Sequence, residues 1–173
     1  MIRSAWLAAA AAGLLVVGGI ALVLLASDDG RGPAVPEGAV AAAVADATPA
    51  AEPFPALTET TIRVGARTLD VVVADEAGER TQGLRGRRHL GAYDGMLFVF
   101  EAPTQTPFTM STVPVPLDIG FYDADGSVVD RLRMQPCPIA SEARCASYRA
   151  SGPFSYALET LVGDLPTGRL ATP

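Results

Sequence analysis

Apolar side chains alternate with polar ones over residues 60–64 and again over residues 67–74. A period of two is typical of strands with one buried face. Gly65 and Ala66 separate the two runs and favour a turn. Residues 60–74 therefore predict two strands joined by a tight connection.

The next segment changes from strand to helix character. Asp75 is a good N-cap residue, and Glu76 and Glu79 would lie in the first turn, where acidic side chains suit the helix dipole. Gly83 then interrupts the pattern. We expect a short helix over residues 76–84.

The remaining apolar runs predict more strands. Their ranges are 95–100 (GMLFVF), 106–110 (TPFTM), 116–122 and 127–134 around an Asp- and Gly-rich turn, and 153–162. Strands predominate and short turns connect most of them. The predicted class is mostly β (α+β): a compact antiparallel sheet or barrel-like domain with one short helix.

The N-terminus carries a different pattern. Residues 5–26 contain no charge, and about 20 apolar residues suffice to span a bilayer as a helix. Arg3 precedes this run and Asp28 and Asp29 follow it, which favours a cytoplasmic N-terminus with the rest of the chain outside. We expect a single-pass anchor in the cytoplasmic membrane. The alternative is a signal segment whose cleavage releases a secreted protein.

Residues 27–56 are rich in Ala, Pro and Gly and have few large apolar side chains. Such a segment buries too little surface to offset its ordering entropy. The sequence thus predicts an anchor over residues 1–26, a disordered linker over 27–56 and a folded domain over 57–173.

Composition narrows the function classes. The 173 residues carry a formal net charge of -6, which argues against a nucleic-acid partner. Cys137 and Cys145, the chain's two cysteines, most simply form one disulfide in an exported protein. A metal site is the alternative, but two thiols without a nearby histidine supply too few ligands.

The sequence lacks the usual catalytic patterns. His89 is the chain's single histidine, and there is no GxSxG elbow, phosphate-binding glycine motif or metal-ligand spacing. No cofactor and no metal are therefore expected. A pair of carboxylates, Asp118 and Glu159, is the remaining arrangement that could carry out acid–base chemistry.

Several motifs occur together in a specific order. They are VVVADEAGERTQGLRGR, GMLFVF, PLDIGFYDADGSVV, a Pro-Cys followed by a second cysteine and a tyrosine, and YALE. From about residue 63 to 164 the chain resembles the domain of unknown function 192 (DUF192) family, also called UPF 0127. The resemblance implies a compact, mostly β domain, often exported or membrane-anchored in bacteria, and it implies no biochemical activity.

The resemblance carries over to individual positions. Arg87, Asp118 and Glu159 match the family pattern. Six further positions also match it: Gly95, Met96, Phe108, Met110, Pro116 and Leu117. Thr109 and residues 111–113 depart from the family's Phe-Trp-Met-Lys-Asn-Thr stretch. These departures fall on the most polar and aromatic part of that pattern.

We therefore expect a non-catalytic extracytoplasmic domain that binds a small ligand or a cell-envelope partner. Its candidate ligand-binding residues are Arg87, Met110, Asp118 and Glu159. The alternatives are a hydrolase that uses Asp118 and Glu159, and a purely structural interaction module of the envelope.

Overall fold

A computed structural model describes residues 38–173 of the chain. The membrane anchor or signal segment predicted for residues 5–26 lies outside the described residues. Within residues 38–173, every helix is too short or too polar to cross a lipid bilayer.

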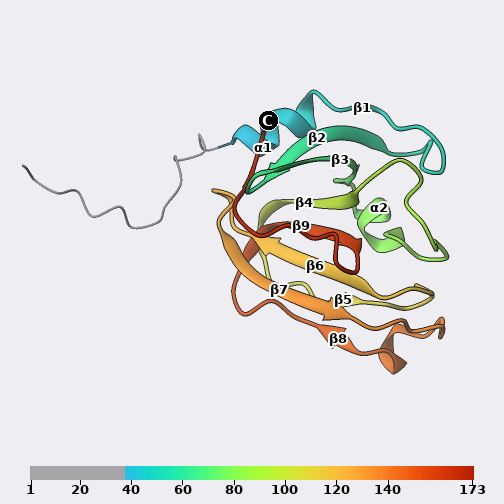
Figure 1. Ribbon diagram of the computed structural model, residues 1–173. Helices are drawn as coiled ribbons and strands as arrows, with labels where there is room; N and C mark the ends of the chain where they lie inside the picture. Colours follow the sequence, from blue (N-terminus) through green and yellow to red (C-terminus); the bar gives the residue numbers. More distant parts are fainter. Residues whose placement is uncertain (1–37) are drawn as a thin grey trace, which may run out of the picture. The chain divides into compact units, whose positions relative to one another are not determined.

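The described part consists mainly of strands (Figure 1). The helices are α1 (Ala39–Ala45), α2 (Ala77–Gln82) and the 3-10 helix η1 (Glu142–Arg144). The strands are β1 (Thr48–Pro49), β2 (Thr58–Val64), β3 (Arg67–Ala74), β4 (Gly95–Thr104), β5 (Phe108–Thr109), β6 (Leu117–Tyr122), β7 (Val128–Met134), β8 (Ser147–Tyr148), β9 (Phe154–Leu161) and β10 (Leu170–Ala171).

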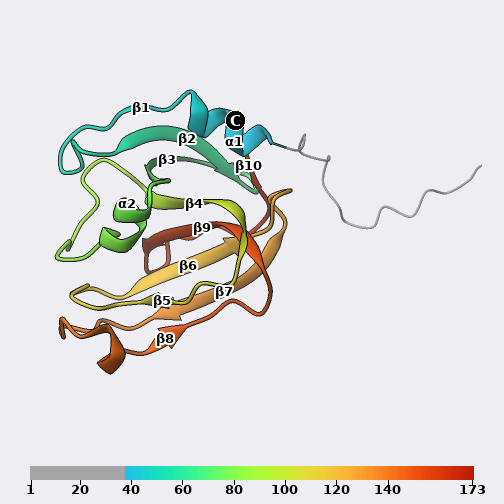
Figure 2. The same ribbon diagram turned by 180° about the vertical axis from the view of Figure 1, so that it is seen from behind.

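Eight strands form one mixed sheet in the order β1-β2-β3-β4-β9-β6-β7, with β10 also paired to β2 (Figure 2). The sheet is open, because the order ends at β1 and β7 without closing on itself. Strands β5 and β8 form a separate antiparallel pair. The mostly β class with one short helix after the first hairpin is confirmed, and the sheet takes the open rather than the barrel-like form.

One pairing differs from the expected antiparallel pattern. Strands β3 and β4 are parallel, because the chain between them crosses over through α2 and the loop over residues 83–94. The helix itself is confirmed, but its N-cap is Glu76 and not Asp75. Glu76 and Glu79 form a reciprocal capping box, which satisfies the first backbone N–H groups of this short helix.

Hydrophobic residues cover both faces of the sheet. One core contains, among others, Val72, Met96, Phe98, Ile119 and Phe121, and the other contains Ile62, Leu69, Leu97, Tyr122 and Leu158. Successive side chains of a strand point to opposite faces, so the central strands contribute to both cores. We call these the α2-side core and the α1-side core.

The segment before β2 is more ordered than its composition suggests. Residues 39–56, expected as part of a disordered linker, form α1 and β1, and Val40 and Phe54 are buried in the two cores. Two well-placed apolar side chains thus anchor a segment that is otherwise poor in them. The expected disulfide between Cys137 and Cys145 is present.

Candidate functional site

Asp118 lies on β6 and takes part in an ion pair. Its carboxylate accepts hydrogen bonds from Nε and Nη2 of Arg133 at 2.8 and 3.2 Å, and from the backbone N–H of Gly163 at 2.8 Å. Arg133 is the direct cross-strand neighbour on β7. The hydrogen bond from Arg133 is the main reason that the pKa of Asp118 is lowered.

Glu159 lies on the central strand β9 and is almost completely buried, with 4% of its surface exposed. Its direct neighbours on the flanking strands are Met96 and Ile119, which belong to the α2-side core. Burial raises the pKa of Glu159 to about 8, and no hydrogen bond or charge within residues 38–173 offsets this effect. Glu159 is therefore mainly protonated at pH 7.

The sheet register separates these two acids. Glu159 pairs with Ile119, whereas Asp118 pairs with Thr160. Paired residues share a face and consecutive residues do not, so the two carboxyl groups point to opposite faces of the sheet. The geometry thus excludes the two-carboxylate arrangement that the hydrolase alternative requires.

The other two candidate residues lie apart from Asp118. Met110 is buried within the α2-side core. Arg87 is exposed, and its guanidinium carbon lies 4.9 Å from the ring centre of Phe54, in a cation–π contact. Glu159, Met110 and the Phe54 ring that Arg87 contacts thus lie on the side of the α2-side core, whereas the Asp118 carboxylate points to the opposite face of the sheet.

A groove of about 530 Å³ lies beside the segment that departs from the family pattern. It runs between α2, the middle of β4, β5 and η1. Its lining residues are Ala77, Arg80, Thr81, Arg85, Phe98, Phe100, Thr106, Pro107, Phe108, Thr109 and Glu142. A volume of this size is within the range of small-molecule sites.

Aromatic rings form the apolar part of the groove. The centre of the Phe108 ring lies 5.1 Å from that of Phe98, with an edge-to-face orientation. Phe108 also contacts Phe121, which fixes it to the α2-side core. Phe100 is half-buried and carries the guanidinium of Arg80, whose carbon lies 5.2 Å from the ring centre.

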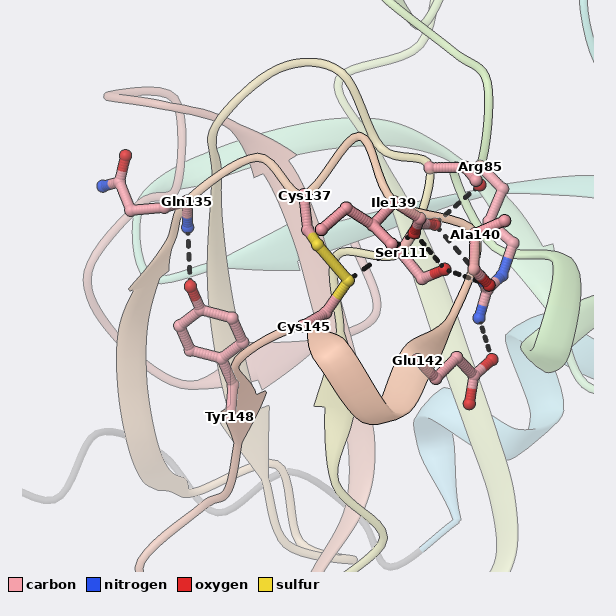
Figure 3. The surroundings of a disulfide bond; sticks show 10 residues. Arg85, Ser111, Gln135, Cys137, Ile139, Ala140, Glu142, Cys145 and Tyr148 are labelled. Carbon is pink, nitrogen blue, oxygen red and sulfur yellow. Dashed lines mark hydrogen bonds and ion pairs between the residues drawn. A yellow bond between two sulfur atoms is a disulfide. The ribbon is translucent and has the colours of Figure 1, made fainter.

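The disulfide-closed loop over residues 137–145 forms one wall of the groove. Ser111 is fully buried, and its hydroxyl contacts the carbonyl oxygens of Ile139 at 2.9 Å and Ala140 at 3.1 Å (Figure 3). The backbone N–H of Thr112 donates to the carbonyl of Cys137. The hydroxyl at position 111, where the family has another residue, thus has a structural use here: it holds this wall in place.

A second hollow of about 330 Å³ lies between β2 and the loop before β4. Its carboxylates already have partners: Glu59 accepts a hydrogen bond from the hydroxyl of Tyr93, and Asp70 accepts one from Thr61 at 2.8 Å. Both carboxylates of this hollow are thus already hydrogen-bonded within it, whereas the first groove combines aromatic rings with two guanidinium groups. We therefore regard the first groove as the candidate site.

The comparisons define the class of protein. Residues 59–169 match the DUF192 model, a family of uncharacterised proteins. The chain belongs to this family. No curated protein matched the chain.

Solved structures are also similar to this chain, among them the following two. A protein of unknown function from Novosphingobium aromaticivorans DSM 12444 has 26% sequence identity and a TM-score of 0.59, over 74% of this chain and 95% of that one. A protein from Sinorhizobium meliloti 1021, described as a candidate transcription regulator, has 30% identity and a TM-score of 0.54, over 65% of this chain and 91% of that one. In both cases the similarity covers more than nine-tenths of the relative's chain.

Sequence reasoning missed most residues of the groove. Arg85 is one of three arginines over residues 85–88, which the sequence alone does not assign to a groove, and Glu142 is 57 positions away from it in the chain. The one available signal was the spacing of Phe98 and Phe100, which places both rings on the same face of a strand.

Proposed function

We propose that this protein is a membrane-tethered, extracytoplasmic domain that binds a small ligand in the groove between α2 and β5 and does not catalyse a reaction. The groove itself is the observation that carries the proposal. It combines three aromatic rings, several hydroxyl groups and two guanidinium groups in one concave surface. The opposite orientations of Asp118 and Glu159 support a binding function over hydrolysis.

The charge of the chain supports a ligand other than nucleic acid. With a net charge of -6, the chain lacks the excess of basic residues that phosphate-backbone binding requires. We therefore do not extend the regulatory description of the Sinorhizobium relative to this chain. The proposed location rests on the apolar run over residues 5–26 and on the disulfide, which persists in oxidising compartments.

A thermal-shift screen of the full-length chain tests the binding proposal. The panel should contain amino acids, short peptides, sugars, organic acids and cell-wall fragments, and a ligand should raise the melting temperature. Ala77→Trp introduces a large side chain at an exposed position that lines the groove, and we expect it to abolish the shift. Ala102→Trp makes the same change at an exposed position outside the lining and should leave the shift intact.

The screen also separates the alternatives. If no compound changes the melting temperature, small-ligand binding loses its support and the structural envelope module becomes the better explanation. If a ligand raises the melting temperature of both tryptophan variants equally, the ligand binds elsewhere and the groove is the wrong site. Protease accessibility of the domain in intact spheroplasts tests the proposed location independently, because an extracytoplasmic domain will be digested.

A further inference from the structure

The guanidinium of Arg85 is held in one orientation at the wall of the groove. Its Nε donates to the carbonyl of Thr81 at 2.9 Å, and its Nη1 donates to the carbonyl of Ser111 at 3.0 Å. These two acceptors belong to α2 and to the segment after β5. A guanidinium fixed from both sides is well prepared to bind a planar carboxylate, because little of its side-chain freedom remains to be lost.

A carboxylate of the chain itself already occupies the remaining side of Arg85. Glu142, on η1 of the disulfide-closed loop, accepts a hydrogen bond from Nη2 of Arg85 (Figure 3). The Arg85 side chain is 23% exposed and that of Glu142 is 55% exposed. A partly exposed pair of this kind adds little stability, so a competing anion can replace Glu142 at small cost.

The rest of the lining suits an anion with an apolar body. Arg80 and Arg85 contribute two positive charges to the groove, and Glu142 contributes its one negative charge. The groove therefore already has an excess of one positive charge beside the rings of Phe100 and Phe108, and displacement of Glu142 would increase this excess. Both features lie within one groove, so a single small molecule can use them together.

We infer that the ligand is a carboxylate with an aromatic or aliphatic body, and that its carboxylate takes the place of Glu142 on Arg85. Glu142 is then an internal competitor that the ligand displaces. This inference rests on the proposed function of the same groove. It goes further in two respects: it names the chemical class of the ligand, and it identifies Glu142 as the residue that weakens binding of that ligand.

Calorimetric titration of the full-length chain tests the inference with two matched probes. N-acetyl-L-phenylalanine carries the carboxylate and the ring, whereas N-acetyl-L-phenylalaninamide carries the ring alone. We expect the acid to bind at least about tenfold more tightly than the amide, because a charge-assisted contact with Arg85 is made by the acid alone. We expect the affinity for the acid to fall as the salt concentration rises, because salt screens this charge–charge contact.

Variants at Glu142 test the competition directly. Glu142→Gln should raise the affinity for the acid by roughly threefold to tenfold, since it removes a competing surface ion pair. Its side chain is mostly exposed, so the variant should fold normally. Glu52→Gln removes one negative charge at an exposed residue outside the groove and should leave the affinity unchanged.

The possible results distinguish the inference from the proposed function. If Glu142→Gln leaves the affinity for the acid unchanged or lowers it, Glu142 is not a competitor and that part is overturned. If acid and amide bind equally and Ala77→Trp abolishes both, the carboxylate class is wrong while the groove remains a binding site. If neither probe binds, the inference fails, whereas the broader ligand screen can still support the groove.

Discussion

Substitution of the buried acid Glu159 should change how the stability of the fold depends on pH. Glu159 is surrounded by apolar neighbours on both flanking strands, and burial raises its pKa from 4.5 to about 8. In the unfolded chain the same group ionises near its ordinary value. Between these two pH values the folded state holds a proton that the unfolded state has lost.

The direction of the effect follows from proton linkage. The contribution of Glu159 to the free energy of unfolding is fully present below about pH 4.5 and is lost as the pH rises from there through about 8. At higher pH the folded state must either take up a proton or bury a charge. A difference of one pKa unit corresponds to about 1.4 kcal/mol. From pH 5 to pH 9 the loss is therefore about 4 kcal/mol of unfolding free energy, a large part of the typical stability of a small domain.

Glu159→Gln keeps the size and polarity of the neutral acid but cannot ionise. Urea denaturation of both proteins from pH 5 to pH 9 measures the effect. We expect the variant to be close to the wild type at pH 5 and to be more stable by about 4 kcal/mol at pH 9. Glu101→Gln, at an exposed position on the neighbouring strand β4, should follow the wild type throughout. A constant difference between Glu159→Gln and the wild type at all pH values would refute the reasoning, because it would mean that Glu159 ionises in the folded state as it does in water.

Three further predictions concern the α1-side core and the loop at the groove. Tyr122→Phe should raise the free energy of unfolding by about 1 kcal/mol in urea denaturation, because the buried Tyr122 hydroxyl has no hydrogen-bond partner within residues 38–173; a loss of stability would contradict this. Gly120→Ala should cost about 1–3 kcal/mol, since its Cβ would lie 2.7 Å from that hydroxyl and 3.0 Å from two ring carbons. The double variant Gly120→Ala/Tyr122→Phe should recover part of this cost, and strictly additive effects would show that the two sites do not touch. Replacing Cys137 and Cys145 together by Ser should cost about 2.5 kcal/mol, the chain-entropy value for so short a loop, and an unchanged denaturation midpoint would show that the bridge adds no stability.

The sequence predicted local elements well because their signals are local. The hairpin formed by β6 and β7 follows from apolar alternation on both sides of an Asp- and Gly-rich turn. Helix α2 follows from its acidic first turn and terminal glycine. In both cases the deciding residues lie within a few positions of each other.

The pairing and register of strands that are distant in the sequence could not be predicted in the same way. Alternation shows that neighbouring residues of one strand face opposite sides, but it does not show which residue of the next strand lies opposite. The register places Glu159 beside Ile119 and not beside Asp118, and this separated two acids that the sequence left as a possible pair. The parallel pairing of β3 with β4 likewise depends on how the crossover through α2 packs against the sheet.

The candidate site shows the same limit more strongly. The sequence directed attention to Thr109 and residues 111–113, which depart from the family pattern, and Thr109 does line the groove. The meeting of Arg85 with Glu142 depends on the disulfide-closed loop and on the buried hydroxyl of Ser111. No pattern of spacing or composition encodes that contact.

Titration of the isotope-labelled full-length chain with N-acetyl-L-phenylalanine, followed by amide NMR, tests the central claim most directly. We predict that shift changes saturate and concentrate on the backbone amides of the residues that line the groove, at positions 77, 80, 81, 85, 98, 100, 106, 108, 109 and 142. We also predict that Ala77→Trp removes these changes and that Ala102→Trp retains them. Saturating changes at a different surface, or changes that persist in Ala77→Trp, would contradict the assignment of the groove as the binding site.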